Sequence, residues 1–134
     1  MALGEIMIAA GLGFRKAITA AEIEAAIVAA LEQSLLESGQ LALIAVPVAK
    51  GAEAGLLAAA AARGIELKLI SQKMLEEASP RTLTHSARSM ALMNVHSVAE
   101  AAALAAAGPR ARLLAPRIAI GSVTCALAQG EPSA

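Results

Sequence analysis

The sequence contains no aspartate, no tryptophan and no tyrosine, and Phe14 is its only aromatic residue. Without aspartate, the chain lacks the usual third member of a Ser-His-Asp triad and the commonest carboxylate ligand of hard metal ions. Its net charge is zero, and it has no set of aromatic rings on which nucleic-acid bases could stack. We therefore expect no nucleic-acid partner and no metal site.

Cysteine and long apolar runs are scarce as well. Cys125 is the only cysteine, so no intramolecular disulfide can form, as is usual in a reducing cytosol. It lies in an apolar stretch without basic neighbours, so we expect a buried, unreactive thiol. The longest run without charge, 118–130, has 13 residues, whereas a membrane span needs roughly 18. Arg15 and Lys16 end the first apolar stretch too early for a signal peptide, and we expect a cytoplasmic protein with no membrane partner.

Short apolar runs alternate with segments rich in alanine, leucine and glutamate. A chain of 134 residues suits a single domain, 1–134. Strand-length runs next to helices of this length predict parallel strands covered by helices on both faces. The predicted strands are 5–10, 41–46 and 66–70, and the predicted helices follow Thr19 as far as Gly39, span 52–62, and follow Ser71.

The second half of the chain is less regular. Residues 81–96 are polar with weak alternation, and we predict a short strand at 85–90 inside long loops, with His85 and His96 as polar loop residues. The remaining predictions are a helix over 97–107, strands at 112–115 and 118–128, and a frayed end over 129–134. The last strands make the sheet mixed, so the predicted fold is α/β, a three-layer α/β/α sandwich with a mixed, mostly parallel sheet.

The segment from Gly11 to Lys16 is predicted to be a loop that holds an anion. Two glycines allow close approach of the backbone, two cations follow, and the next helix directs its N–H groups towards the same place. The alternative is a tight strand-to-helix turn. A dinucleotide site is disfavoured because Lys16 takes the place of the third glycine. Phe14 is interpreted as a plug under the loop or as a ring that stacks on a flat ligand.

Cations are predicted to gather at one edge of the sheet. In an open parallel sheet, ligands bind beyond the carboxyl ends of the strands. Arg15 and Lys16 follow the first predicted strand, and Lys50 follows the second, while most glutamates fall on helices. We expect a cationic mouth that takes a polycarboxylate or a phosphate.

Several glutamates have two interpretations. Thr19 with Glu22 and Ser97 with Glu100 have the spacing of capping boxes. Lys50 and Glu53 are three residues apart at the mouth of the crevice. They are either an ordinary surface pair or a general acid/base pair.

Three blocks of sequence carry a family resemblance. They are Gly11-Leu12-Gly13-Phe14-Arg15-Lys16 with Thr19-x-x-Glu22-Ile23, Lys50-x-x-Glu53-x-Gly55-Leu56, and Ser97-Val98-Ala99-Glu100-Ala101-Ala102-Ala103-Leu104. In this order, over about residues 5–128, the chain resembles the family of the cobalamin biosynthesis protein CobE, which is similar to the C-terminal domain of the cobalt-precorrin-5A hydrolase CbiG. It differs from the family at Phe14, where cysteine is frequent, at Ala17, where glycine is frequent, and at 94–96, where a glycine is frequent.

The resemblance implies a cytoplasmic protein of corrin ring synthesis that binds a precorrin and uses no cofactor. The implied ligand-binding residues are Gly11, Gly13, Phe14, Arg15, Lys16, Lys50 and Ser97, with loops 85–96 closing over the ring. If the chain assists lactone opening or ring contraction, Glu53 or Glu100 is the implied base and Lys50 the polarising acid. The alternative is a non-catalytic carrier or scaffold that hands precorrins to a pathway methyltransferase.

Overall fold

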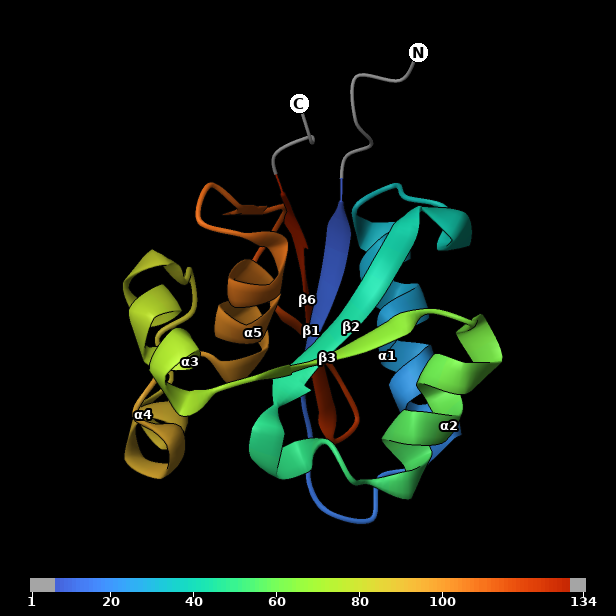
Figure 1. The fold of residues 1–134 in the computed structure, drawn as a ribbon, viewed down its shortest axis with the longest axis horizontal. Coiled ribbons are helices and arrows are strands. Elements are labelled where there is room, and N and C mark those ends of the chain that lie inside the picture. Colours follow the sequence, from blue (N-terminus) through green and yellow to red (C-terminus); the bar gives the residue numbers. More distant parts are fainter. Residues whose placement is uncertain (1–6, 131–134) are drawn as a thin grey trace.

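The computed structural model describes residues 7–130, which form one sheet with helices on both of its faces (Figure 1). The strands are β1 (Ile8–Gly13), β2 (Leu41–Pro47), β3 (Glu66–Ile70), β4 (Arg112–Leu113), β5 (Ile118–Ile120) and β6 (Val123–Gln129). The α-helices are α1 (Ala20–Gln33), α2 (Ala54–Arg63), α3 (Gln72–Ala78), α4 (Ala87–Met93) and α5 (Val98–Ala107). Short 3-10 turns are η1 (Ser38–Gln40), η2 (Val48–Lys50) and η3 (Ser79–Arg81).

The sheet is mixed, as predicted, with the strand order β3-β2-β1-β6-β4. Strands β1, β2 and β3 are parallel, while β6 runs antiparallel to β1, β4 and β5. Because β4 pairs with the end of β6 and β5 with its beginning, both lie along the outer edge of β6. Only β6 runs against the other strands of the described chain, so its N-terminal end lies beside the carboxyl end of β1.

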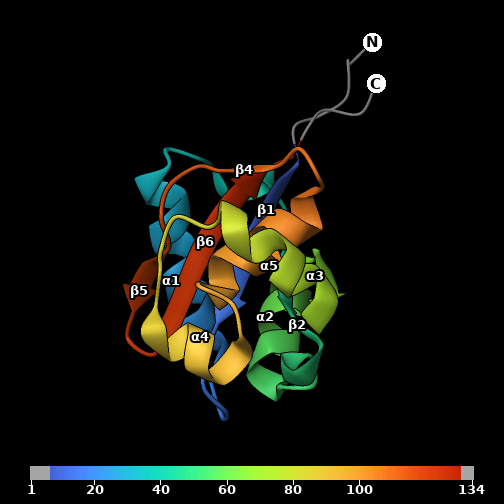
Figure 2. The same cartoon turned by 90° about the vertical axis from the view of Figure 1, so that its left-hand side faces the viewer.

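Helices cover both faces of the sheet, which confirms the three-layer prediction. Helices α1 and α2 lie on one face and α3 and α5 on the other (Figures 1 and 2). Side chains of β1 alternate between the two cores: Ile8, Ala10 and Leu12 pack on the α1 side, whereas Ala9 packs on the α5 side. Within residues 7–130 no single helix could span a membrane, and α4 and α5 meet that criterion only when joined across a 68° bend.

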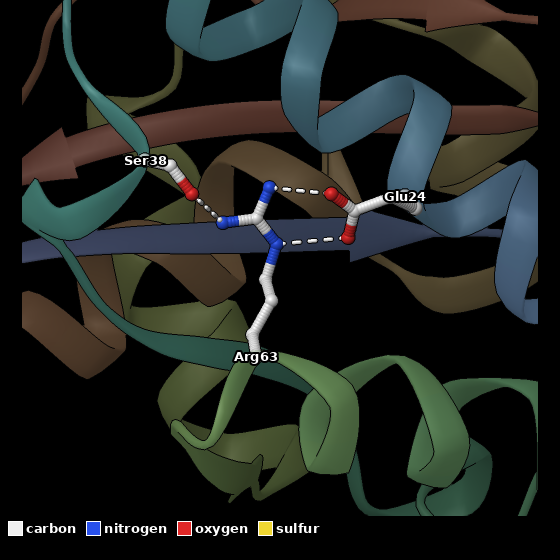
Figure 3. Close-up of polar contacts among 3 residues, drawn as sticks. All are labelled: Glu24, Ser38 and Arg63. Carbon is white, nitrogen blue, oxygen red and sulfur yellow. Dashed lines mark hydrogen bonds and ion pairs between the residues drawn. The ribbon is translucent and has the colours of Figure 1, made fainter.

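An ion pair fastens the two helices of the first face to each other. Arg63 ends α2 and donates from Nε and Nη2 to the two carboxylate oxygens of Glu24 in α1, at 2.8 and 2.7 Å (Figure 3). Its Nη1 donates to the hydroxyl of Ser38 at 2.8 Å. The arginine side chain is only 10% exposed, so this bidentate pair is better shielded than most surface ion pairs.

Local capping signals place the predicted helix starts correctly. Thr19 and Glu22 form the predicted capping box, and Ser71 caps α3 through the N–H of Met74. The end of α1 differs from the prediction. Leu35 adopts a left-handed conformation (φ 57°) just after the helix, so the chain leaves α1 before Gly39, which lies in η1.

The predicted strand at 85–90 is wrong, because these residues lead into and form part of α4. Ser86 accepts a hydrogen bond from the N–H of Ser89 and caps the helix. Alanine, leucine, methionine and arginine in α4 are good helix formers, and this propensity outweighs the weak polar alternation.

Near both chain ends, the described strands differ in extent from the predicted ones, with β1 spanning Ile8–Gly13 and β6 ending at Gln129. Glu5 and Ile6 of the first predicted strand and residues 131–134 of the predicted frayed end lie outside the described residues. Gln129 belongs to β6, and the N–H of Gly130 donates to the carbonyl of Met7 at 2.8 Å. The ladder between β1 and β6 therefore continues further than predicted. Near its other end, β5 and β6 are separate strands joined at Gly121 (φ 60°).

Gly11 belongs to β1 and not to a loop, which corrects its assignment to the anion-binding segment. A Cβ atom at this position would lie 1.9 Å from the carbonyl oxygen of Ala99 and 2.6 Å from the backbone nitrogen of Ala103. Helix α5 therefore lies directly on the backbone of β1, and only glycine permits this approach.

Replacing Gly11 with alanine should lower the free energy of unfolding by about 2–4 kcal/mol, because α5 would have to move away from the sheet. Urea denaturation measures this loss. Gly39→Ala is the control, since nothing lies within 4 Å of a Cβ there and its φ is not positive. Equal stability of the two variants would contradict the close packing of α5 on Gly11.

Candidate functional site

A cleft of about 570 Å³ lies where β1 and β2 end, at the edge of the sheet predicted from the sequence. Its near wall comes from the last residues of these two strands and the chain that follows them. Its far wall comes from α4, the first residue of α5, the turn between β5 and β6, and the start of β6. The lining residues are Gly13, Phe14, Arg15, Lys16, Pro47 and Lys50 on the near wall, and Arg88, Ser89, Leu92, Met93, Val98, Gly121, Ser122 and Thr124 on the far wall.

Four cations and no carboxylate line the described cleft. Arg15 and Lys16 come from the loop after β1, Lys50 from η2, and Arg88 from α4. The ammonium of Lys50 lies 5.7 Å from the centre of the ring of Phe14, which holds it over the near wall by a cation–π contact. The cleft is therefore suited to an anion with several negative groups.

Glu53 shapes the near wall from outside the cleft lining. Its carboxylate accepts a hydrogen bond from the N–H of Ala17 at 3.0 Å, which ties the loop of Arg15 and Lys16 to the start of α2. A Cβ at Gly55 would lie 2.1 Å from the carbonyl oxygen of Ile18, so α2 docks closely on the same segment. The block Lys50-x-x-Glu53-x-Gly55 thus supplies one cleft cation and two residues that fix the loop.

Ala17 has a left-handed backbone (φ 62°), which is costly for alanine. The related family frequently has glycine at this position, and glycine adopts this conformation without strain. The hydrogen bond that the N–H of Ala17 donates to Glu53 opposes this strain.

Glu100 is fully buried and shapes the far wall. Its carboxylate accepts hydrogen bonds from the N–H groups of Leu83 (2.6 Å) and Thr84 (2.9 Å), from the hydroxyl of Thr84 (2.5 Å) and from the N–H of Arg117 (2.8 Å). Burial raises the pKa of this carboxyl, but the four hydrogen bonds outweigh burial and hold the pKa below its usual 4.5. Glu100 is thus an ionised acceptor that connects α5 to two loops.

The capping box predicted for Ser97 and Glu100 forms on one side only. The hydroxyl of Ser97 accepts from the N–H of Glu100 at 3.4 Å and caps α5. The carboxylate of Glu100 points instead to Leu83, Thr84 and Arg117. Ser97 is fully buried and is not part of the cleft lining.

The predicted site residues therefore separate into two groups. Gly13, Phe14, Arg15, Lys16 and Lys50 lie together in the cleft lining. Phe14 is buried, in agreement with its interpretation as a plug. The other predicted residues lie outside the lining, in the structure that supports the cleft: Gly11, Glu53, Ser97 and Glu100.

Sequence reasoning missed Arg88 and the apolar side chains of α4. The available signals were the cap at Ser86 and the helix formers that follow it, which place Arg88 and Leu92 on one helical face. It also missed that His85 and His96 meet: their rings stack with centroids 4.4 Å apart, and the N–H of Ser86 donates to the carbonyl of His96. The two histidines thus bring together the chain before α4 and the chain after it.

Cys125 is a buried thiol, as expected. Burial raises its pKa to about 12, against a smaller opposing effect of Arg63. Within residues 7–130, no three side chains of the metal-binding types gather in one place.

Replacing Glu100 with glutamine should lower the free energy of unfolding by about 2–4 kcal/mol at neutral pH, because one acceptor oxygen becomes an amide that faces N–H donors. The folded-state pKa of Glu100 is depressed, so its contribution is complete above the unfolded value near 4.5 and is lost as the pH falls through the folded value. The difference from the wild-type protein should shrink over that acid range. Urea denaturation at a series of pH values measures both effects.

Glu32→Gln provides the control, because Glu32 is exposed on α1. This variant should lie within about 0.5 kcal/mol of the wild-type protein. A Glu100→Gln protein as stable as this control would show that the buried carboxylate does not hold the far wall.

Comparison with known proteins agrees with the fold and with the sequence blocks. A family model described as cobalamin synthesis G C-terminus matches residues 8–128. A search of curated protein sequences finds no match. The structure is similar to the crystal structure of CobE, a protein from the cobalamin (vitamin B12) biosynthetic pathway, with a TM-score of 0.90 and 29% identity over 100% of this chain and 98% of that chain.

Two further structures are similar. The cobalamin biosynthesis protein chiG from Agrobacterium tumefaciens gives a TM-score of 0.74 and 39% identity over 92% of this chain and 98% of that chain. A cobalamin biosynthesis protein G homolog from Sulfolobus solfataricus, with 24% identity and a TM-score of 0.71 over 96% of this chain and 37% of that chain, shares the fold. Since the family model covers nearly all of the described residues, the chain belongs to the family of the cobalamin synthesis G C-terminus and takes part in cobalamin biosynthesis.

Proposed function

We propose that the cleft binds a precorrin, a corrin precursor that carries many carboxylates around a flat macrocycle. The observation that carries this proposal is the gathering of Arg15, Lys16, Lys50 and Arg88 in one cleft whose described lining has no carboxylate. Membership in a family of cobalamin biosynthesis supports it, because the intermediates of that synthesis are anions of this kind.

The cleft offers both kinds of contact that such a ligand needs. Arginines pair with carboxylates through two parallel hydrogen bonds, and lysines pair with them as point charges. Between the cations lie apolar surfaces from Pro47, Leu92 and Val98 that suit the face of a macrocycle. An ordinary phosphate ligand would leave these apolar surfaces uncovered.

The same geometry favours binding over general-base catalysis. The two candidate bases, Glu53 and Glu100, have their carboxylates engaged with backbone N–H groups outside the lining. Lys50 belongs to the cleft lining, whereas Glu53 and Glu100 do not. The second candidate function, a carrier that hands precorrins to a pathway methyltransferase, is favoured by this separation of cation and carboxylate.

Reversing the charge of Arg15 and Lys50 together should weaken binding of a corrin polycarboxylate about 100-fold, because two attractive contacts become repulsive. The probe is cobyrinic acid, a stable corrin polycarboxylate, and its absorbance or isothermal calorimetry gives the Kd. Lys73→Glu with Arg110→Glu changes the net charge equally on exposed residues outside the lining and should bind as the wild-type protein does. Unchanged affinity of the Arg15/Lys50 variant would contradict the proposed site.

Incubation of the purified protein with a precorrin lactone tests the carrier function. We expect binding without ring opening, because no carboxylate of the described chain lies in the lining to act as a base. Mass spectrometry of the tetrapyrrole before and after incubation follows the ring opening. Turnover by the protein alone would replace the carrier function with a hydrolase.

A further inference from the structure

Helix α4 has no buried residue, although it lies between two well-packed segments of the chain. Leu92 is 68% exposed, and Met90 is also exposed. A short helix gains most of its stability from packing an apolar face, and in α4 Met93 packs against the core on the α5 side of the sheet while Met90 and Leu92 stay exposed. Helix α4 therefore carries exposed apolar side chains that its own packing does not use.

The ends of α4 are fixed, whereas its middle is not. Before the helix, the N–H of Ser86 donates to the carbonyl of His96 at 3.0 Å. After it, Gln72 donates from its amide to the carbonyl of Met93 at 2.6 Å, and Asn94 donates from its amide to the carboxylate of Glu76 at 3.3 Å. The helix is thus attached at its two ends, whereas Arg88 and Leu92 between them are exposed.

One face of α4 lines the cleft. Arg88 and Leu92 are four residues apart, as are Ser89 and Met93, so these side chains share a face. The first half of this face carries a guanidinium and a hydroxyl, and the second half carries two apolar side chains. This face of α4 therefore presents both polar groups and apolar surface to the cleft that Arg15, Lys16 and Lys50 also line.

We propose that α4 is a ligand-dependent cover of the cleft, in which Arg88 binds a ligand carboxylate and the exposed Leu92 covers the apolar face of the macrocycle. This inference rests on the proposed binding of a corrin polycarboxylate. The ligand supplies an apolar surface for Leu92, which is 68% exposed in the free protein, so ligand binding and local opening of α4 are coupled. The ligand is the partner of this surface because Arg88 and Leu92 both belong to the cleft lining.

Amide hydrogen exchange with and without saturating cobyrinic acid tests the coupling. The amides of α4 should exchange about tenfold more slowly in the complex, because the ligand suppresses local opening. The amides of the last turn of α2, at the end of the helix opposite Glu53, provide the internal reference and should change little. Binding without protection of α4 would overturn the cover.

Two matched pairs of variants test the roles of charge and order. Arg88→Glu should raise the Kd for cobyrinic acid about tenfold or more, whereas Arg110→Glu, an equal change at an exposed residue outside the lining, should leave it unchanged. Ala91→Gly weakens α4 without removing a lining residue and should raise the Kd about fivefold. Ala58→Gly makes the same change at an exposed position of α2 and should not affect binding.

Failure of this inference is distinct from failure of the proposed function. If the wild-type protein does not bind cobyrinic acid, the proposed function falls and this inference falls with it. If the wild-type protein binds but Arg88→Glu and Ala91→Gly bind equally well, only the role of α4 is overturned. Far-ultraviolet circular dichroism of each variant establishes that the rest of the fold is retained.

Discussion

The far wall of the cleft depends on the buried carboxylate of Glu100. From a fixed position in α5 it receives the N–H groups of Leu83, Thr84 and Arg117, which belong to two separate segments of chain. The first segment leads into α4, and the second leads through β5 to the turn at Gly121. Because α5 itself lies against β1 at Gly11, this single side chain relates both parts of the far wall to the centre of the sheet.

Glu53 plays the corresponding part for the near wall. It receives the N–H of Ala17 and so fixes the loop that carries Arg15 and Lys16. Both carboxylates are balanced by hydrogen bonds from backbone N–H groups, with one hydroxyl added at Glu100. Among residues 7–130, no arginine or lysine side chain forms an ion pair with either carboxylate, so the cations of the cleft are not used for this purpose.

The parts of the fold that could be predicted from the sequence rest on local signals. Runs of strand length identified β2 and β3, and Thr19 and Ser71 marked helix starts. The edge of the sheet that carries the cleft followed from the parallel strands. The missed parts depend on contacts between distant residues. Gly11 looked like a flexible loop residue because the approach of Ala99, 88 positions later, is invisible in the local sequence. The partners of Glu100 and the stacking of His85 on His96 are of the same kind.

The cations of the cleft are set apart from the acidic side chains of the described chain. The chain has eleven basic and eleven acidic side chains, enough to pair every cation. In the described part of the chain, however, the ion pair formed is between Arg63 and Glu24, on the side of the sheet covered by α1 and α2. Four cations without a carboxylate in the described lining give the cleft a positive potential, although Arg15, Lys16 and Arg88 are exposed and partly screened by solvent. An anionic ligand that excludes water from the cleft would weaken this screening, so the same cations would contribute more to binding than they do in the free protein.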